Sequence, residues 1–137
     1  LFMQKWKRRA LAFLYRPALL AQAPGLPVAK RMLGSMGYPV ERELDAILPH
    51  LEARLYNSDA FPHEIGFFLG YPPADVVGFI LYNGKRCKHS CMWKVYGDVE
   101  KAVKLCDEYR ACSHQCCRYV ETGGDLPTLP EAARPAV

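Results

Sequence analysis

Apolar residues recur at spacings of three and four positions along residues 41–56, the pattern typical of a helix with one buried face. The apolar positions of this segment are Leu44, Ile47, Leu48, Leu51 and Leu55. Charged residues occupy the other side, which should therefore contact solvent. Pro49 falls inside the pattern and lacks the backbone N–H that a helix uses, so we expect a kink or a break there.

A second helical pattern covers residues 99–120, where the apolar positions form one broad stripe. Asp98 stands directly before this segment and is placed to cap its N-terminus. Gly123-Gly124 follows the segment and should end the helix. A shorter apolar pattern that begins near Pro27 predicts a further helix over roughly residues 27–36.

Short apolar runs bounded by proline or glycine predict strands over residues 11–15, 64–69 and 92–96. Pro72-Pro73 cannot continue a strand, because proline lacks an N–H donor, but proline fits the first turn of a helix. The apolar residues that follow therefore predict a short helix, which Asn83-Gly84 ends.

The predicted order of elements is β-α-α-β-α-β-α, which indicates a small α/β sandwich with about three central strands and helices packed on them. With 137 residues, half of them hydrophobic, the chain is long enough for one domain with its own core. We assign this single α/β domain to residues 9–120. Residues 1–8 form a basic segment before it, and residues 121–137 form a proline-rich tail that we expect to be disordered.

Two stretches of the sequence carry a resemblance to a known family. They are FPHEIGFFLGYPPADVVGFI at residues 61–80 and WKVYGDVEKAVKLCDEY at residues 93–109. Both are similar to a bacterial family called domain of unknown function 3793, whose members share a similar HEIG-FLGYP-DV-GFI block, then WKVY and an A--L---Y--C helix. The resemblance covers roughly residues 9–120, and the N-terminal segment usual in the family looks incomplete. It supports the expected fold and implies no particular activity.

Charge is distributed unevenly along the chain, whose net charge is +4. Residues 1–36 hold seven Lys and Arg and no acid, whereas the remainder holds eleven basic and fourteen acidic residues. A basic end can attract nucleic acid, anionic lipid or an acidic partner, although a solvated strand edge carries the same charges. Basic and aromatic residues also mix at 85–96, but the acids nearby make a nucleic-acid groove the weaker interpretation.

The first 25 residues have the outline of a secretory signal, because basic residues precede an apolar stretch and Ala21-Gln22-Ala23 resembles a cleavage site. Arg16-Pro17 interrupts the apolar stretch, however, which argues against a signal. No apolar run approaches the roughly 20 residues that span a bilayer. We therefore expect a cytoplasmic protein, in which cysteines are more often thiols or metal ligands than disulfides.

Four of the six cysteines make a candidate metal site. Cys87 and Cys91 lie in a predicted loop, whereas Cys112 and Cys116 are one helical turn apart and share a face. The four together can form a tetrahedral thiolate site for zinc, or hold an iron–sulfur cluster. The spacing is not that of a C-x2-C site, so reduced thiols without a ligand are the interpretation that we favour, with redox chemistry and disulfides also open.

A ligand pocket is the other candidate site. The turns at residues 70–75 and 97–98 each connect a predicted strand to a helix, and ligands of open α/β sheets bind at such ends of strands. The pocket candidates are Tyr71, Asp75, Tyr96 and Asp98, together with the adjacent His63 and Glu64. A His beside a carboxylate can perform acid–base chemistry, but neighbours on a strand point to opposite faces. Ordinary turns and helix caps are the simpler explanation of these residues.

Three classes of function stay open. No set of acid, base and nucleophile stands out, which favours a non-catalytic binding or accessory protein with a protein partner or a small ligand. One alternative is a thiol or metal protein that uses the four cysteines. The other is a small enzyme with its pocket at the turns 70–75 and 97–98.

Overall fold

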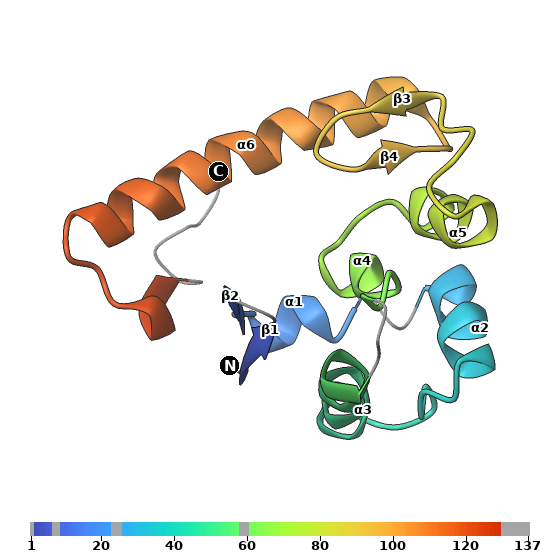
Figure 1. Ribbon diagram of the computed structural model, residues 1–137, viewed down its shortest axis with the longest axis horizontal. Helices are drawn as coiled ribbons and strands as arrows, with labels where there is room; N and C mark the ends of the chain where they lie inside the picture. The colour runs from blue at the N-terminus through green and yellow to red at the C-terminus, as the bar shows by residue number, and fades with distance from the viewer. Residues whose placement is uncertain (1, 7–8, 23–25, 58–60, 130–137) are drawn as a thin grey trace. The chain divides into compact units, whose positions relative to one another are not determined.

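The computed structural model describes residues 2–6, 9–22, 26–57 and 61–129 of the chain (Figure 1). The chain divides into two compact units. One unit is continuous and runs from Pro17 to Gly97, and the other combines residues 1–16 with residues 98–137. Each unit contains helix and a two-stranded antiparallel sheet, so the fold is mixed α and β, with helix predominating.

The continuous unit consists of short helices followed by a small hairpin. Its described helices are α1 (Pro17–Leu20), α2 (Pro27–Ser35), α3 (Leu44–Asn57), α4 (Ile65–Phe68) and α5 (Pro73–Tyr82). Its strands are β3 (His89–Ser90) and β4 (Lys94–Val95), which pair with each other in antiparallel fashion. The structure confirms the helices predicted over 27–36, over 41–56 and after Pro73, and α3 continues through Pro49 without a break.

The core of this unit uses the apolar faces that the sequence pattern predicts. Leu33 on α2 and both Leu51 and Leu55 on α3 have no exposed surface. Full burial of a leucine side chain contributes about 2 kcal/mol. These side chains therefore explain why α2 and α3 form, even though α3 contains a proline.

Helix α5 is the element around which the unit is assembled, because it contacts α2, α4 and β4. Its contact with the hairpin depends on Gly78, which is buried on α5. A Cβ atom at this position would lie 2.3 Å from Cγ of Tyr96, the residue directly after β4. The missing side chain of Gly78 thus lets an aromatic ring pack directly on the backbone of α5.

The strand predicted over residues 64–69 was wrong, because this segment is the helical turn α4. The backbone N–H groups of Gly66 and Phe67 donate to carbonyls three residues back, and that of Leu69 donates to Ile65, four residues back. All four residues of α4 are buried. An apolar run that is buried on every side has no helical periodicity, so in sequence it looks the same as a buried strand.

The central sheet of about three strands is not present in the described part of the chain, where two separate two-stranded sheets occur instead. The strand predicted over 92–96 is reduced to Lys94 and Val95 of β4. Lys94 pairs with Ser90 and Val95 pairs with His89, so the two strands form a short hairpin. The α/β sandwich is therefore corrected to a largely helical unit with a hairpin.

The second unit contains a hairpin from the start of the chain and a long helix from its end. Strands β1 (Phe2–Trp6) and β2 (Arg9–Phe13) are antiparallel, and β2 overlaps the strand predicted over 11–15. Helix α6 (Val99–Glu121) confirms the helix predicted over 99–120. The Asp98 side chain accepts a hydrogen bond from the N–H of Lys101 at 3.1 Å, which confirms the predicted N-cap.

The described part of the predicted tail contains a short helix. The short 3-10 helix η1 (Leu126–Thr128) follows α6, and the hydroxyls of Tyr119 and Thr128 lie 2.7 Å apart. The composition of the tail does not predict this local structure. Residues 130–137 of the tail, and residues 7 and 8 of the basic segment, lie outside the described residues.

The packing of Gly78 predicts opposite effects for the same substitution at two helical glycines. Gly78→Ala should destabilise the protein by about 1 to 3 kcal/mol, because the new methyl group overlaps the Tyr96 ring. Gly34→Ala is the matched control on α2, where a Cβ would meet Val40 at an ordinary 3.5 Å. It should stabilise by roughly 0.5 to 1 kcal/mol through helix propensity. Urea unfolding measures both, and a Gly78 variant as stable as the wild type would contradict the packing.

Candidate functional site

Asp75 is a buried carboxylate in the first turn of α5, with 2% of its surface exposed. One of its oxygens, Oδ2, accepts a hydrogen bond from the indole Nε1–H of Trp93 at 2.8 Å. The other, Oδ1, accepts from the backbone N–H groups of Tyr96 and Gly97, both at 2.8 Å. A buried carboxylate is costly unless hydrogen bonds replace its water, and these three donors fill that role. Asp75 therefore binds the segment 93–97 to α5.

The hairpin of β3 and β4 places the Trp93 side chain against α5. The N–H of Lys88 donates to the carbonyl of Val95 at 2.8 Å, and the N–H of Cys91 donates to the carbonyl of Trp93 at 2.9 Å. The ammonium group of Lys88 also contacts the carbonyl of Gly97 at 3.0 Å. Because these bonds fix both sides of the turn, the indole is held in one orientation.

A cavity of about 510 Å³ lies beside Asp75 within the continuous unit. Most of the side chains that line it are aromatic or aliphatic, and a few are polar. The lining consists of Phe61, His63, Ile65, Gly66, Leu69, Tyr71, Asp75, Val76, Phe79, Ser90, Cys91, Met92, Trp93 and Lys94. Sites for small molecules are concave spaces of about 300 to 1,000 Å³ with a similar mixture of groups.

Two pairs of rings form walls of this cavity. The rings of Tyr71 and Trp93 are stacked, with centroids 4.5 Å apart and planes inclined by 22°. The imidazole of His63 lies 4.6 Å from the ring of Phe79. Burial raises the pKa of Tyr71, so its hydroxyl keeps its proton to a higher pH than an exposed tyrosine does. The walls thus offer flat apolar surfaces with a polar group at their edge.

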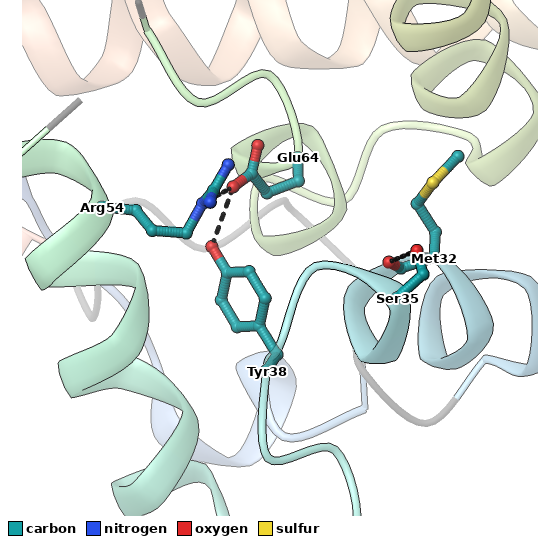
Figure 2. Close-up of polar contacts among 5 residues, drawn as sticks. All are labelled: Met32, Ser35, Tyr38, Arg54 and Glu64. Atoms are coloured by element: carbon teal, nitrogen blue, oxygen red, sulfur yellow. Dashed lines mark hydrogen bonds and ion pairs between the residues drawn. The ribbon is translucent and has the colours of Figure 1, made fainter. Parts of the chain in front are cut away.

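Glu64 is a second buried carboxylate, with 2% of its surface exposed, and it precedes α4. Figure 2 shows the Tyr38 hydroxyl and the Arg54 guanidinium both directed at its Oε1 atom. The distance from the Tyr38 hydroxyl is 3.1 Å, and Arg54 Nε forms an ion pair with the same oxygen. Glu64 thereby joins α3 and the segment after α2 to α4, and it serves the architecture of the unit.

The environment of Tyr38 shifts its ionisation strongly. Burial, followed by the negative charge of Glu64 and the hydrogen bond to it, raises the pKa of Tyr38 far above its ordinary value. The hydroxyl therefore keeps its proton above the pH at which an exposed tyrosine ionises. Tyr38 also lies against the ring of His50, with centroids 4.3 Å apart, so the aromatic ring and its hydroxyl both fix this corner of the core.

Three of the six predicted pocket residues lie together in the cavity wall, namely His63, Tyr71 and Asp75. The adjacent Glu64 is engaged with Tyr38 and Arg54, so it does not form an acid–base pair with His63. The predicted separation of these two side chains is thus found, although a helical turn and not a strand produces it.

The remaining two predicted pocket residues have other partners. The Tyr96 ring stacks on Tyr82 with centroids 5.8 Å apart, and its hydroxyl donates to the carbonyl of Lys85 at 2.9 Å. Burial, with a smaller effect of Cys87, raises the pKa of Tyr96. Asp98 caps α6, and the hydrogen bond from the N–H of Lys101 lowers the pKa of its carboxyl. Neither side chain belongs to the cavity lining.

Sequence reasoning missed Trp93, which is both a wall of the cavity and a partner of Asp75. It also missed Phe61, Phe79 and Met92 in the lining. The available signal was chemical, since a buried tryptophan needs an acceptor for its N–H and Asp75 is an acid within an apolar segment. The pairing itself depends on the hairpin turn, which no pattern in the sequence specifies.

The candidate cysteines are divided between the two units, with Cys87 and Cys91 in one and Cys112 and Cys116 in the other. In the described part of the chain, free thiols are found at Cys87, Cys112, Cys116 and Cys117, and Cys91 is not among them. Within residues 2–6, 9–22, 26–57 and 61–129, no three His, Cys, Asp or Glu side chains gather closely enough to hold a metal ion. The four-cysteine site for zinc or an iron–sulfur cluster stays a prediction.

Comparison with known proteins identifies the family. A sequence model of the family described as protein of unknown function (DUF3793) matches residues 1–129. The chain belongs to this family. A search of the curated proteins and a search of the solved structures each found no match. For this DUF3793 chain the cavity is therefore the main evidence on function.

Among the described residues, no helix combines the length and the apolar character that crossing a bilayer requires.

The hydrogen bonds of Asp75 predict that this carboxylate is far more important for stability than Asp98. Asp75→Asn replaces one acceptor oxygen with an NH2 group that faces N–H donors, and it should cost about 2 kcal/mol or more. Asp98→Asn is the matched control, because asparagine caps a helix as well as aspartate does. Chemical denaturation of both variants measures the difference, and equal stabilities would refute the role assigned to Asp75.

The raised pKa of Tyr38 predicts that its contribution to stability declines at high pH. Unfolded tyrosine loses its proton near pH 10, whereas folded Tyr38 keeps it, so the unfolded state gains free energy of ionisation above about pH 10. At neutral pH, Tyr38→Phe should cost about 1.5 to 3 kcal/mol through loss of the bond to the carboxylate. Above pH 10 the gap to wild type should shrink by about 1.4 kcal/mol per pH unit. Urea titrations between pH 8 and pH 11 test this, and a constant gap would contradict it.

Proposed function

We propose that this protein binds a small, planar and largely apolar molecule with an anionic group, and that it does so as a non-catalytic binding or accessory protein. The observation that carries the proposal is the cavity of about 510 Å³ with the stacked pair Tyr71 and Trp93 in its wall. A flat aromatic surface favours a flat ligand, because stacking adds to the gain from burial.

The rim of the cavity supports the same proposal. Phe61, Leu69 and Met92 belong to the lining, and between 39% and 42% of the surface of each is exposed. Exposed large apolar side chains are costly in water, and when they surround a concavity they indicate a place where a ligand is buried. A bound molecule would cover part of each of these side chains.

The charges of the lining support an anionic group on the ligand. Among the described lining residues, Asp75 is acidic, Lys94 is basic and His63 contributes an imidazole. The carboxylate of Asp75 already accepts three hydrogen bonds from its own chain. Lys94 is exposed at the cavity, so its ammonium group is the charge most accessible to a ligand.

The same contacts favour binding over catalysis. Asp75 is the acidic residue of the described lining, and its oxygens hold Trp93 and the backbone of residues 96–97 in place. An enzyme pocket at the turns 70–75 and 97–98 has less support, since Asp98 caps α6 and lies outside the lining. The proposal also keeps the expectation of a cytoplasmic protein, which depends on Arg16-Pro17 in the apolar stretch.

An aromatic anion tests the proposal directly. Anilinonaphthalene sulfonate, titrated into the full chain in a calorimeter, should bind with a stoichiometry near one. Leu69→Trp places a bulkier side chain at the rim and should weaken binding by about tenfold or more, equivalent to about 1.4 kcal/mol. Leu81→Trp is the matched control. Leu81 lies on α5 and is exposed, as Leu69 is, but it does not belong to the cavity lining.

The controls separate the cavity from unspecific binding of the dye. Leu81→Trp should leave the affinity close to that of the wild type. The proposal would be abandoned if the dye did not bind, or if both tryptophan variants weakened binding equally. Near-ultraviolet circular dichroism of each variant checks that the native packing is present, because loosely packed states also bind this dye.

A further inference from the structure

Two free thiols lie one turn apart on α6, outside the cavity. Cys112 and Cys116 are both free thiols, and both are half-buried. Residues four apart lie on the same face of a helix, so the backbone of α6 holds this pair together. Solvent reaches both groups, which leaves them available for chemistry.

The helix makes a disulfide between these two residues unfavourable. Their Cβ atoms are about 5 to 6 Å apart at this spacing, whereas a disulfide requires about 3.5 to 4.5 Å. A metal ion bound linearly between the two sulfurs has a different requirement. With metal–sulfur bonds of about 2.3 Å, the length found in zinc–thiolate sites, the sulfurs lie about 4.6 Å apart. The geometry of an intact α6 therefore suits a bridging ion better than a direct bond.

We propose that Cys112 and Cys116 form a two-thiolate site for a soft univalent cation, copper(I). Soft thiolate ligands favour copper(I), zinc and iron–sulfur clusters, and of these copper(I) is the one that two thiolates can hold alone. Zinc normally takes four protein ligands, and in the described part of the chain no three His, Cys, Asp or Glu side chains gather for it. The site differs from the four-cysteine hypothesis because it needs neither Cys87 nor Cys91.

The binding reaction involves no change of oxidation state. One copper(I) ion displaces the protons of two thiols, forms two copper–sulfur bonds and releases two protons to solvent. The complex carries one negative charge. Its formation should therefore protect two thiols from alkylation without altering the helix.

The test measures copper(I) affinity by competition with bicinchoninate, using the full chain under anaerobic conditions. Wild-type protein should take up about one equivalent that the competitor removes only at high concentration. Cys112→Ser and Cys116→Ser should each weaken this binding by more than about tenfold, since each removes a direct ligand. Cys117→Ser and Cys87→Ser are the matched controls, because both residues are free thiols outside the pair.

Thiol counting gives a second readout. Copper(I) should protect two thiols from alkylation in the wild type, and mass spectrometry of peptides should assign them to Cys112 and Cys116. Far-ultraviolet circular dichroism should show unchanged helix in every variant. Failure of the protein to compete with bicinchoninate would overturn the proposal, and so would a loss in the Cys117 or Cys87 variant as large as that in the Cys112 and Cys116 variants.

Discussion

The continuous unit depends on one buried carboxylate, that of Asp75. The hairpin of β3 and β4 is too short to be stable alone, because a two-stranded ribbon of this length has few hydrogen bonds and little apolar surface. Asp75 supplies what the hairpin lacks, since it accepts the indole N–H of Trp93 and two backbone N–H groups of the segment that follows β4. The hairpin is therefore attached to α5 by charge-assisted bonds in addition to packing.

Glu64 applies the same principle where α3, α4 and the segment after α2 meet. Its acceptor oxygen is shared by Tyr38 and Arg54, which come from segments 26 and 10 residues away in the sequence. A buried charge weakens a fold if one partner is removed, because the desolvation cost remains while the compensation is lost. Two such carboxylates constrain which segments can meet, and in a unit made of short helices this constraint selects one arrangement from several possible ones.

Local signals in the sequence predict most of the helices, and tertiary contacts explain where they fail. The spacing of leucines locates α3, Pro73 locates the start of α5, and the Asp98 cap locates the start of α6. Each of these signals acts within one or two helical turns of the chain. The segment 64–69 gave the wrong element because its burial comes from all sides, so its pattern has no period. The predicted sheet lacks a strand at residues 64–69 because this segment forms the helix α4.

The candidate site was also predictable only in part. His63, Tyr71 and Asp75 could be proposed because they are polar residues beside turns, and they do line one cavity. Tyr96 and Asp98 stand beside an equivalent turn, yet Gly78 and the start of α6 give them other partners. The partnership of Asp75 with Trp93 spans 18 residues and depends on the path of the hairpin, so it is a property of the fold and not of any local motif.

Helix α5 links the cavity to the stability of the unit. Asp75, Val76 and Phe79 line the cavity, while Gly78 on the same helix packs against the ring of Tyr96. Trp93 contributes both to the cavity and to the stability of the unit, because its ring forms a wall and its N–H donates to Asp75. A molecule that stacks in the cavity would restrain the same indole that attaches the hairpin to α5. The proposed ligand binding would thus be coupled to folding of this unit through one side chain, because a ligand that binds only the folded form raises its stability by mass action.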